Sequence, residues 1–439
     1  MNRKIISAAF TGTDPAFILQ TIFGHKEFRG NQQKIIEQVL SGHDCLAIMP
    51  TGGGKSLCYQ IPALILPGIT IVVSPLISLM QNQVIALKAL GIDSLFFSEL
   101  NSQLQYNEAI TKIKNGNIKI IYVSPESLSG LKIRRFLNDS QVSVSCITID
   151  EAHCISEWGH DFRPDYMDIR FFHTEFPDAT LLALTATATE RVRSDIIKNL
   201  RMKKPEIFIS SFNRKNIYLE VQPKINPKSQ ILEFLQNHNE QCGIIYCFSR
   251  SKVDEIFNFL KANDFTVTKY HAGLSDKIRT KNQEMFISGK VKIIVATVAF
   301  GMGIDKSDVR FVINYDLPKS LEEYYQEIGR AGRDGLASTA LLLFSRSDEH
   351  KIRYFFEDCA NPQQSEKNLQ KMIEFSTANT CRRKVLLKYF GETYEPHNPG
   401  EKEFCCDICT KALGIERLSS AADYFLKNRV QKRTIKYQM

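Results

Sequence analysis

The feature that most constrains the fold is an alternation of short apolar runs with helical patterns, which extends from residue 40 to about residue 345. The runs are rich in Ile, Val and Leu and are bounded by turn residues, which is typical of parallel strands covered on both faces. Strands that alternate with helices indicate right-handed βαβ units. We therefore predict an α/β fold built on parallel sheets.

The apolar runs fall into two sets, and each set predicts one lobe. The first set is residues 45–49, 70–73, 118–123, 145–149 and 181–184, and the second is 242–247, 266–270, 293–296, 311–314 and 339–343. The sets meet near residues 202–222, where Pro205 and Pro223 flank a polar segment. We expect a first lobe over residues 1–205 and a second over residues 206–345.

The last part of the chain differs from the two lobes. Strand signals stop after Ser345, and residues 346–400 show helical patterns. We expect a helical subdomain over residues 346–412 and a basic C-terminal tail over 413–439. Prolines and a glycine interrupt the longest apolar stretch, residues 61–73, so we expect no membrane span.

Charge and cysteine content narrow the class of protein. The chain has 56 Lys and Arg against 48 Asp and Glu, a formal net charge of +8. This excess favours an anionic partner such as nucleic acid, although an ordinary solvated basic surface fits it as well. Most of the eleven cysteines stand singly in apolar contexts, which indicates a reduced intracellular protein rather than a disulfide framework.

A glycine-rich sequence between a predicted strand and a predicted helix is the strongest functional signal. Residues 49–56 read Met-Pro-Thr-Gly-Gly-Gly-Lys-Ser. Such a loop lets backbone amides surround phosphate oxygens at a helix N-terminus. Lys55 would neutralise the β- and γ-phosphates of ATP, and Ser56 would ligate magnesium. The remaining residues predicted to bind the phosphates are Thr51, Gly52, Gly53 and Gly54. A chance glycine-rich turn is the alternative.

Two carboxylates follow another predicted strand. Asp150 and Glu151 come directly after residues 145–149, and ligands of open parallel sheets bind beyond the carboxyl ends of strands. Phosphoryl transfer needs charge neutralisation and positioning. We therefore expect Asp150 to hold magnesium, and Glu151 to orient and deprotonate the attacking water. A solvated acidic turn is the alternative.

With these residues in place, the chain resembles superfamily 2 helicases, and specifically the RecQ family. The further segments that carry the resemblance are residues 23–29, 73–80, 124–126, 153–164, 184–188, 297–305 and 325–334. The resemblance implies two RecA-like lobes of the P-loop NTPase type, followed by a small helical zinc-binding subdomain. It also implies ATP, magnesium and zinc as cofactors.

The resemblance assigns further nucleotide contacts. Gln32 would bond the adenine edge, and Arg29 would assist it. His25 stands where the family usually has a stacking tyrosine. In the second lobe, the segment that ends at Asp305 is implied to touch nucleotide and, through Thr297, DNA.

Two arginines lie in the segment that resembles an arginine-finger motif. A guanidinium that meets the transferring phosphoryl group offsets the charge that spreads over it. We expect Arg333 to be this finger and Arg330 to be a second phosphate or sensor residue. If the finger comes from the opposite lobe, hydrolysis requires closure. The alternative is a structural pair of either arginine with Asp334 or Glu327.

Residues 153–164 resemble the aromatic-rich loop of RecQ proteins. This segment contains Trp158, the only tryptophan of the chain, among polar residues and glycine. Stacking of a base on an aromatic ring is worth about 1–3 kcal/mol, so we expect the loop to bind single-stranded DNA. A packing role is the alternative for Trp158. The residues implied to contact DNA in the first lobe are Ser74, Trp158, His160, Phe162 and Arg163.

A cysteine cluster near the C-terminus predicts a structural zinc site. Four thiolates form a closed tetrahedral zinc site, and the predicted ligands are Cys381, Cys405, Cys406 and Cys409. Because Cys405 directly adjoins Cys406, joint ligation demands an unusual turn. His397 or water is the alternative fourth ligand, and reduced surface cysteines are the alternative to a site. Four basic residues on the helix expected after Cys381 could meet phosphates or lie on a solvated helix face: Arg382, Arg383, Lys384 and Lys388.

The resemblance implies an ATP-dependent DNA helicase that moves 3′ to 5′ on single-stranded DNA and separates duplexes in repair and recombination. We expect single-stranded and forked DNA as partners, contact with repair or recombination proteins, and a monomer. The expected location is the bacterial cytoplasm at the nucleoid, or the nucleus if the source is eukaryotic. The alternatives are a DNA-stimulated translocase with little unwinding, a non-enzymatic zinc DNA-binding protein and an RNA motor.

Overall fold

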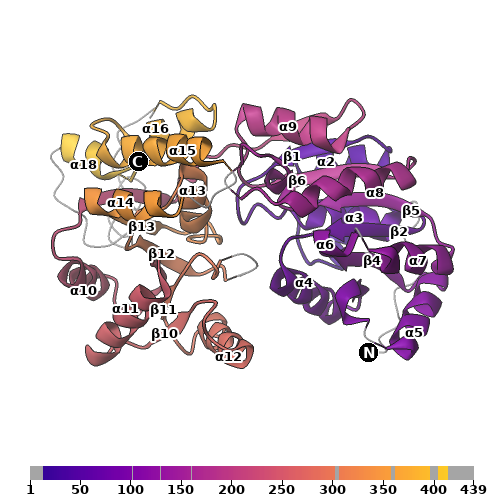
Figure 1. Cartoon of the computed structure of the whole chain (residues 1–439), viewed down its shortest axis with the longest axis horizontal. Helices are drawn as coiled ribbons and strands as arrows, with labels where there is room; N and C mark the ends of the chain where they lie inside the picture. Colours follow the sequence, from indigo (N-terminus) through magenta and orange to yellow (C-terminus); the bar gives the residue numbers. More distant parts are fainter. Residues whose placement is uncertain are drawn as a thin grey trace, which may run out of the picture. The chain divides into compact units, whose positions relative to one another are not determined.

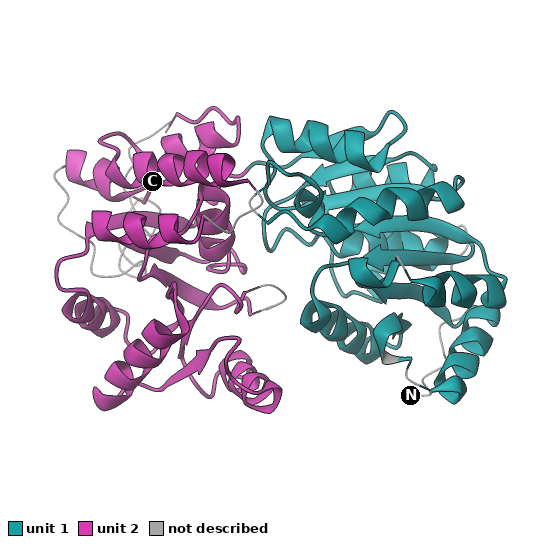
Figure 2. Cartoon of the chain, viewed as in Figure 1, with its two compact units in different colours: residues 1–211 teal, residues 212–439 magenta. Residues whose placement is uncertain are grey.

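A computed structural model of the chain describes residues 13–100, 102–128, 130–159, 161–301, 306–356, 361–395 and 404–413. The chain divides into two compact units, Met1–Ser211 and Phe212–Met439 (Figure 2). Each unit is built around its own parallel sheet (Figure 1). Among the described residues, no helix is long and apolar enough to cross a membrane.

The first unit contains a seven-stranded sheet with the order β3-β4-β2-β5-β6-β1-β7, in which all neighbouring strands are parallel. Its strands are β1 (Cys45–Ile48), β2 (Ile69–Val73), β3 (Asp93–Phe96), β4 (Ile118–Val123), β5 (Val144–Ile149), β6 (Thr180–Thr185) and β7 (Glu206–Ile209). Every residue of β1, β2 and β6 is buried, as expected of central parallel strands.

Helices connect these strands and bury them. The α-helices of the first unit are α1 (Pro15–Thr21), α2 (Gln32–Leu40), α3 (Leu57–Ile65), α4 (Ile77–Ala89), α5 (Gln103–Lys114), α6 (Pro125–Leu128), α7 (Leu131–Ser140), α8 (Ile169–Glu175) and α9 (Glu190–Leu200). Short 3₁₀ turns are η1 (Phe97–Glu99), η2 (Ala152–Ile155) and η3 (Pro164–Asp168). All nine residues of α3 are buried, which fixes the helix that follows the glycine-rich loop.

The second unit contains a six-stranded parallel sheet with the order β10-β11-β9-β12-β13-β8. Its strands are β8 (Ile217–Pro223), β9 (Cys242–Tyr246), β10 (Val267–Tyr270), β11 (Ile293–Ala296), β12 (Val309–Asn314) and β13 (Ser338–Phe344). Its helices are α10 (Pro227–Asn237), α11 (Arg250–Ala262), α12 (Asp276–Ile287), α13 (Leu321–Ile328), α14 (Arg346–Tyr354), α15 (Pro362–Thr377), α16 (Arg382–Tyr389) and α18 (Asp407–Ala412).

The C-terminal helical part packs on the edge of the second sheet. The amide of Leu219 in β8 donates to the carbonyl of Cys405 at 3.2 Å, and Leu219 and Cys406 form a parallel bridge. The hydroxyls of Tyr218 and Thr410 lie 2.7 Å apart. These contacts cover the edge strand, whose backbone groups would otherwise lack partners.

All ten apolar runs predicted as strands are strands in the structure, so the α/β prediction is confirmed. The sequence missed β3, β7 and β8, which are all edge strands. The segment read as a polar connection contains β7, which pairs with β1 in the first sheet. Its first residue is Glu206, where the sequence division placed the start of the second lobe, whereas the compact units divide after Ser211.

Candidate functional site

The glycine-rich loop lies at the carboxyl end of β1, next to β6. The amide of Met49 donates to the carbonyl of Thr185 at 3.0 Å, which fixes the start of the loop. Gly52 and Gly54 have φ of 80° and 75°, a left-handed conformation that favours glycine. The ammonium of Lys55 donates to the carbonyl of Met49 at 3.3 Å and is half-buried. Residues with side chains would adopt this backbone conformation only with strain, so the loop requires glycine at these two positions.

Gln32 ties the loop to the segment that precedes α2. Its buried side-chain amide donates to the carbonyls of Gly53 and Gly54 at 3.3 and 3.0 Å, and its oxygen accepts from the amide of Arg29 at 2.8 Å. The predicted bond between Gln32 and adenine would therefore replace at least one of these bonds. His25 and Arg29 are exposed, so both are accessible to a nucleotide, and their roles remain predictions.

The two predicted catalytic carboxylates follow β5, which is separated from β1 by β6 alone. The amide of Asp150 donates to the carbonyl of Val73 at 2.9 Å, and the amide of Glu151 donates to the Asp150 carboxylate at 3.0 Å. Burial and the neighbouring Glu151 charge raise the pKa of Asp150 to about 7, while Lys55 opposes this rise. A carboxylate so poorly solvated is one that a bound cation would stabilise.

Glu151 belongs to a polar chain that sequence reasoning missed. One Glu151 carboxylate oxygen lies 3.3 Å from Nδ1 of buried His153, and the same nitrogen lies 2.9 Å from the hydroxyl of Thr185. That hydroxyl accepts from the amide of Thr187 at 3.2 Å. The chain connects the ends of β5 and β6, and Glu151 stands in the left-handed region with φ of 48°. The contact between His153 and Thr185 joins two motifs that become neighbours only in the fold, so neither motif alone predicts it.

The aromatic-rich loop contacts two other candidate segments. Arg163 donates to the Asp161 carboxylate at 3.1 and 3.2 Å and to the carbonyl of Pro75 at 3.3 Å. The hydroxyl of Tyr166, two residues after the loop in η3, donates to the carbonyl of Asp150 at 3.0 Å. The loop is therefore joined to the segment after β2, and the 3₁₀ turn that follows the loop is joined to the carboxyl end of β5.

The predicted DNA-binding residues differ in exposure. Trp158, Phe162 and Arg163 are partly exposed, whereas Ser74 is buried, with 2% of its surface accessible. A contact of the Ser74 hydroxyl with DNA thus requires a local movement, and it remains a prediction. His160 lies outside the described residues.

In the second unit, the arginine motif, residues 325–334, begins in the last turn of α13 and is bound by Arg214. The guanidinium of Arg214 donates to the carbonyls of Gly329, Ala331 and Gly332 at 3.3, 2.8 and 2.9 Å. Asn216 also donates to the carbonyl of Gly332, at 2.8 Å. Sequence reasoning missed Arg214, because its partners lie more than a hundred residues away in the chain.

The two arginines of this motif differ in burial. Arg330 is 9% exposed, and Arg333 is partly exposed. The Asp334 carboxylate, which was an alternative partner for these two arginines, forms a salt bridge with Arg310. Thr297 is partly exposed and its amide donates to the carbonyl of Tyr270 at 3.2 Å, while Asp305 lies outside the described residues.

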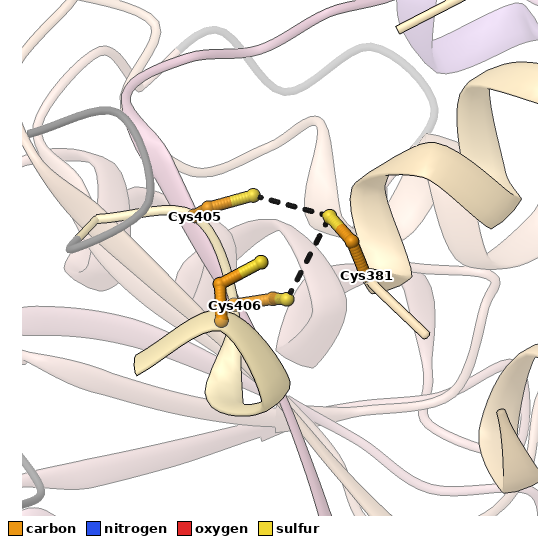
Figure 3. Close-up of side chains that lie close together, drawn as sticks. Cys381, Cys405 and Cys406 are labelled. Carbon is orange, nitrogen blue, oxygen red and sulfur yellow. Dashed lines mark hydrogen bonds between the residues drawn. The ribbon is translucent and has the colours of Figure 1, made fainter. Parts of the chain in front are cut away.

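The four C-terminal cysteines converge. Their sulfur atoms all lie within 4.8 Å of one another. Figure 3 shows the Cys381 side chain facing those of Cys405 and Cys406, at sulfur–sulfur distances of 3.5 and 4.0 Å. Sulfurs about 2.3 Å from a tetrahedral zinc ion would lie about 3.8 Å apart. The set therefore fits a closed zinc site.

The adjacent cysteines both reach this cluster. Cys405 lies in a turn and Cys406 in an extended conformation, with φ of −163° and ψ of 165°, at the start of α18. The change of backbone conformation between the two residues brings both sulfurs to the same side. His397, the alternative ligand, lies outside the described residues.

The suggestion that Arg382 and Arg383 meet phosphates, or lie on a solvated face, is wrong. The two side chains are 6% and 4% exposed. Arg382 binds the Asp407 carboxylate with two nitrogens, and Arg383 donates to the carbonyls of Arg214 and Cys405 at 2.8 and 3.3 Å. Arg382 thus fastens α16 to α18 within the zinc region, whereas Arg383 joins α16 to the residues that lead into β8.

Three protein-family models match the chain in succession. A DEAD/DEAH box helicase model matches residues 29–196, a helicase conserved C-terminal domain model matches residues 226–335, and a RecQ zinc-binding model matches residues 346–410. The first two matches lie one in each compact unit, and the third covers the cysteine cluster.

Curated relatives are similar over most of this chain. The ATP-dependent DNA helicase RecQ of Pasteurella multocida is 44% identical, over 89% of this chain and 61% of the relative. The ATP-dependent DNA helicase RecQ of Bacillus subtilis is 42% identical, over 93% of this chain and 69% of the relative. The chain thus spans about three fifths of the length of the first of these relatives.

Solved structures share the fold at low sequence identity. The Saccharomyces cerevisiae protein Dbp5, solved with RNA and ADP BeF3, has a TM-score of 0.62 and 18% identity. The match covers 82% of this chain and 97% of that one. Two RecA-like lobes followed by a zinc-binding region are therefore the architecture of this chain.

Proposed function

This chain belongs to the RecQ family of helicases, and on that premise we propose that it is an ATP-dependent DNA helicase that moves 3′ to 5′ along single-stranded DNA and separates duplexes. The observation that carries the proposal is the constellation in the first unit. The Lys55 loop and the Asp150-Glu151 pair follow β1 and β5, and β6 alone lies between these strands. This is the edge at which parallel α/β sheets bind their ligands.

We propose that the residues of this constellation divide the work of ATP hydrolysis. Lys55 and the amides from Thr51 to Gly54 bind the phosphates. Ser56 and Asp150 hold magnesium, which neutralises phosphate charge when bound. Glu151 accepts a proton from the attacking water, and Nδ1 of His153 lies 3.3 Å from one of its carboxylate oxygens.

We further propose that the arginine motif of the second unit supplies positive charge to the transferring phosphoryl group. Arg333 is the finger, because its side chain is partly exposed. Arg330, which is buried, is the second phosphate or sensor residue. Arg214 is a positioning residue, since its guanidinium binds three carbonyls of the same segment.

The proposed substrate is single-stranded and forked DNA, and the proposed setting is repair and recombination. The names of the relatives and the aromatic-rich loop support DNA. We propose that the chain acts as a monomer with repair or recombination proteins, in the cytoplasm of a bacterium or in a eukaryotic nucleus.

Strand-separation assays test this proposal. The wild-type chain, with zinc and magnesium, is mixed with a duplex that carries either a 3′ or a 5′ single-stranded tail. We expect ATP-dependent separation of the 3′-tailed duplex and none of the 5′-tailed one. Faster separation of the 5′-tailed duplex would contradict the polarity. DNA-stimulated hydrolysis without separation of either would identify a translocase, and stimulation by RNA alone would identify an RNA motor.

A further inference from the structure

One face of α9 holds the aromatic-rich loop through three residues spaced four apart. The side chain of Asn199 donates to the carbonyl of Ile155 at 3.4 Å, and the Asp195 carboxylate accepts from the hydroxyl of Ser156 at 3.0 Å. The third residue of the stripe is Arg191, whose guanidinium lies 3.0 Å from the ring centroid of Trp158. Residues at this spacing share one helix face, so α9 is a scaffold for the loop.

The turn around Trp158 is tight, which gives the indole a defined position. The amide of Trp158 donates to the hydroxyl of Ser156 at 3.2 Å, and the amide of Gly159 donates to the carbonyl of Ser156 at 2.9 Å. A side chain at Gly159 would come within 2.6 Å of the carbonyl oxygen of His153. The indole is partly exposed, and the guanidinium of Arg191 covers one of its faces.

Arg191 stands where a positive charge does little for helix stability. It lies in the first turn of α9, directly after Glu190, and Thr189 caps the helix by accepting from the amide of Val192. Cations stabilise the last turn of a helix, whereas the N-terminal turn favours anions. Among the residues that the structure describes, no carboxylate forms a salt bridge with Arg191, and its side chain is exposed. The position suits contact with an external anion.

We propose that Trp158 and Arg191 together form a binding site for one nucleotide of single-stranded DNA. The base stacks on the indole face that Arg191 covers in the free protein, and the displaced guanidinium binds the adjacent phosphate. This inference rests on the proposed function and adds Arg191 to its DNA-binding residues. A cation–π contact is no stronger than base–aromatic stacking, and an arginine–phosphate bond is charge-assisted, so the exchange favours the DNA-bound arrangement.

Trp158 provides its own reporter, because it is the only tryptophan among 439 residues. Selective excitation of tryptophan therefore reports on this site alone. The experiment titrates an oligothymidylate into the full chain with zinc bound, at several salt concentrations, for the wild type, Arg191→Ala, Arg191→Lys and Lys198→Ala. Lys198 is exposed on the same helix about 10 Å further along, so its replacement removes the same charge without touching the indole.

We expect Arg191→Ala to alter the tryptophan emission of the free protein, and to weaken DNA binding about five- to tenfold. The slope of log affinity against log salt should fall by about 0.7, the share of one phosphate contact on a single strand. Arg191→Lys should keep the slope and recover part of the affinity, because it retains the charge without the planar fork. Lys198→Ala should bind with the emission change of the wild type.

Several results would overturn the inference. If Arg191→Ala keeps the affinity and salt slope of the wild type, Arg191 is no DNA contact, and the proposed helicase function stands. Unchanged emission in the free Arg191→Ala protein would show that the guanidinium does not cover the indole in solution. If the wild type binds no single-stranded DNA at all, both the inference and the proposed function fail.

Discussion

At the scale of single residues, the structure adds partners to the motifs that the sequence identifies. Lys55, Ser56, Asp150 and Glu151 stand in contiguous motifs next to apolar strands, so residue type and order are enough to find them. The bonds of Gln32 to the phosphate loop and of His153 to Thr185 join segments 21 to 32 residues apart. Such contacts depend on which strands lie side by side, and a linear pattern contains no such information.

Replacement of Lys55 tests the phosphate site. We expect Lys55→Ala to lower ATP turnover about 10²- to 10³-fold, because an ammonium aimed at phosphate oxygens supplies charge stabilisation in a water-poor site. Binding of single-stranded DNA should persist, since Lys55 lies in the phosphate loop and not in the aromatic-rich loop. Phosphate release and fluorescence anisotropy with labelled DNA measure the two properties.

The matched control for this prediction is Lys34→Ala. Lys34 is exposed on α2, so its replacement removes one charge from the same unit outside the loop. Its turnover should equal that of the wild type. Unchanged turnover in Lys55→Ala would remove Lys55 from the mechanism.

At the scale of the elements, the strands that sequence reasoning missed are the least buried ones. The residues of β7 alternate little and only Phe208 is buried, and β3 is buried only at Phe96. An edge strand has a neighbour on one side only, so selection for a continuous apolar run is weaker. The sequence predicted the central strands correctly because helices cover both of their faces. Such strands are apolar at every position, and this continuous pattern is visible in the sequence.

Arg214 also shows that a pattern in the sequence does not reveal contacts between distant segments. Arg214 lies within residues 202–222, the stretch that reads as a polar connection, yet its guanidinium binds carbonyls 115 to 118 residues away. We expect Arg214→Lys to lower kcat about tenfold with little change in KM for ATP or in DNA affinity, because an ammonium cannot reproduce the arginine fork. Steady-state kinetics measure this split.

A double-variant cycle separates positioning from general stability. If Arg214 acts by positioning the arginine motif, Arg214→Lys combined with Arg333→Ala should be no slower than Arg333→Ala alone. Arg279→Lys, in the same unit but on α12, is the control and should leave kcat unchanged. Losses that multiply in the double variant would contradict the positioning role.

The cysteine cluster makes a prediction about metal content. Wild-type protein should contain about one zinc ion per chain, and Cys405→Ser should lose most of it, because a closed structural site needs all four ligands. Thermal unfolding of Cys405→Ser should begin at a lower temperature, since Cys405 and Cys406 bond to β8 at the edge of the second sheet.

Metal analysis of purified protein and calorimetry provide these measurements. Cys242→Ser is the control, because Cys242 is a single cysteine on β9, outside the cluster. It should keep its zinc. Full retention of zinc by Cys405→Ser would exclude Cys405 as a ligand.

At the scale of the whole molecule, the sequence predicted the order of parts: two parallel-sheet lobes and then a helical zinc region. This order follows from the two sets of apolar runs and from the cysteine spacing, which are both local in the sequence. The division between the units could not be placed as closely. The strands β7 and β8 on either side of it are edge strands whose polarity resembles that of a connection.

The net charge of the whole chain indicates more about function when it is combined with the motifs. A net charge of +8 alone fits many proteins. In combination with a phosphate loop, paired carboxylates and an aromatic-rich loop followed closely by Tyr166, which bonds to the carbonyl of Asp150, it supports the proposal of a motor that senses an anionic polymer. The central claim is therefore that DNA binding and ATP hydrolysis are coupled.

ATP turnover at increasing concentrations of single-stranded DNA is the measurement that tests this coupling most directly. The full chain is assayed with magnesium and zinc, and Lys55→Ala supplies the background rate. We predict that wild-type turnover rises with DNA concentration to a plateau, while the Lys55→Ala rate stays at background throughout. Wild-type turnover that is the same at every DNA concentration would contradict the account.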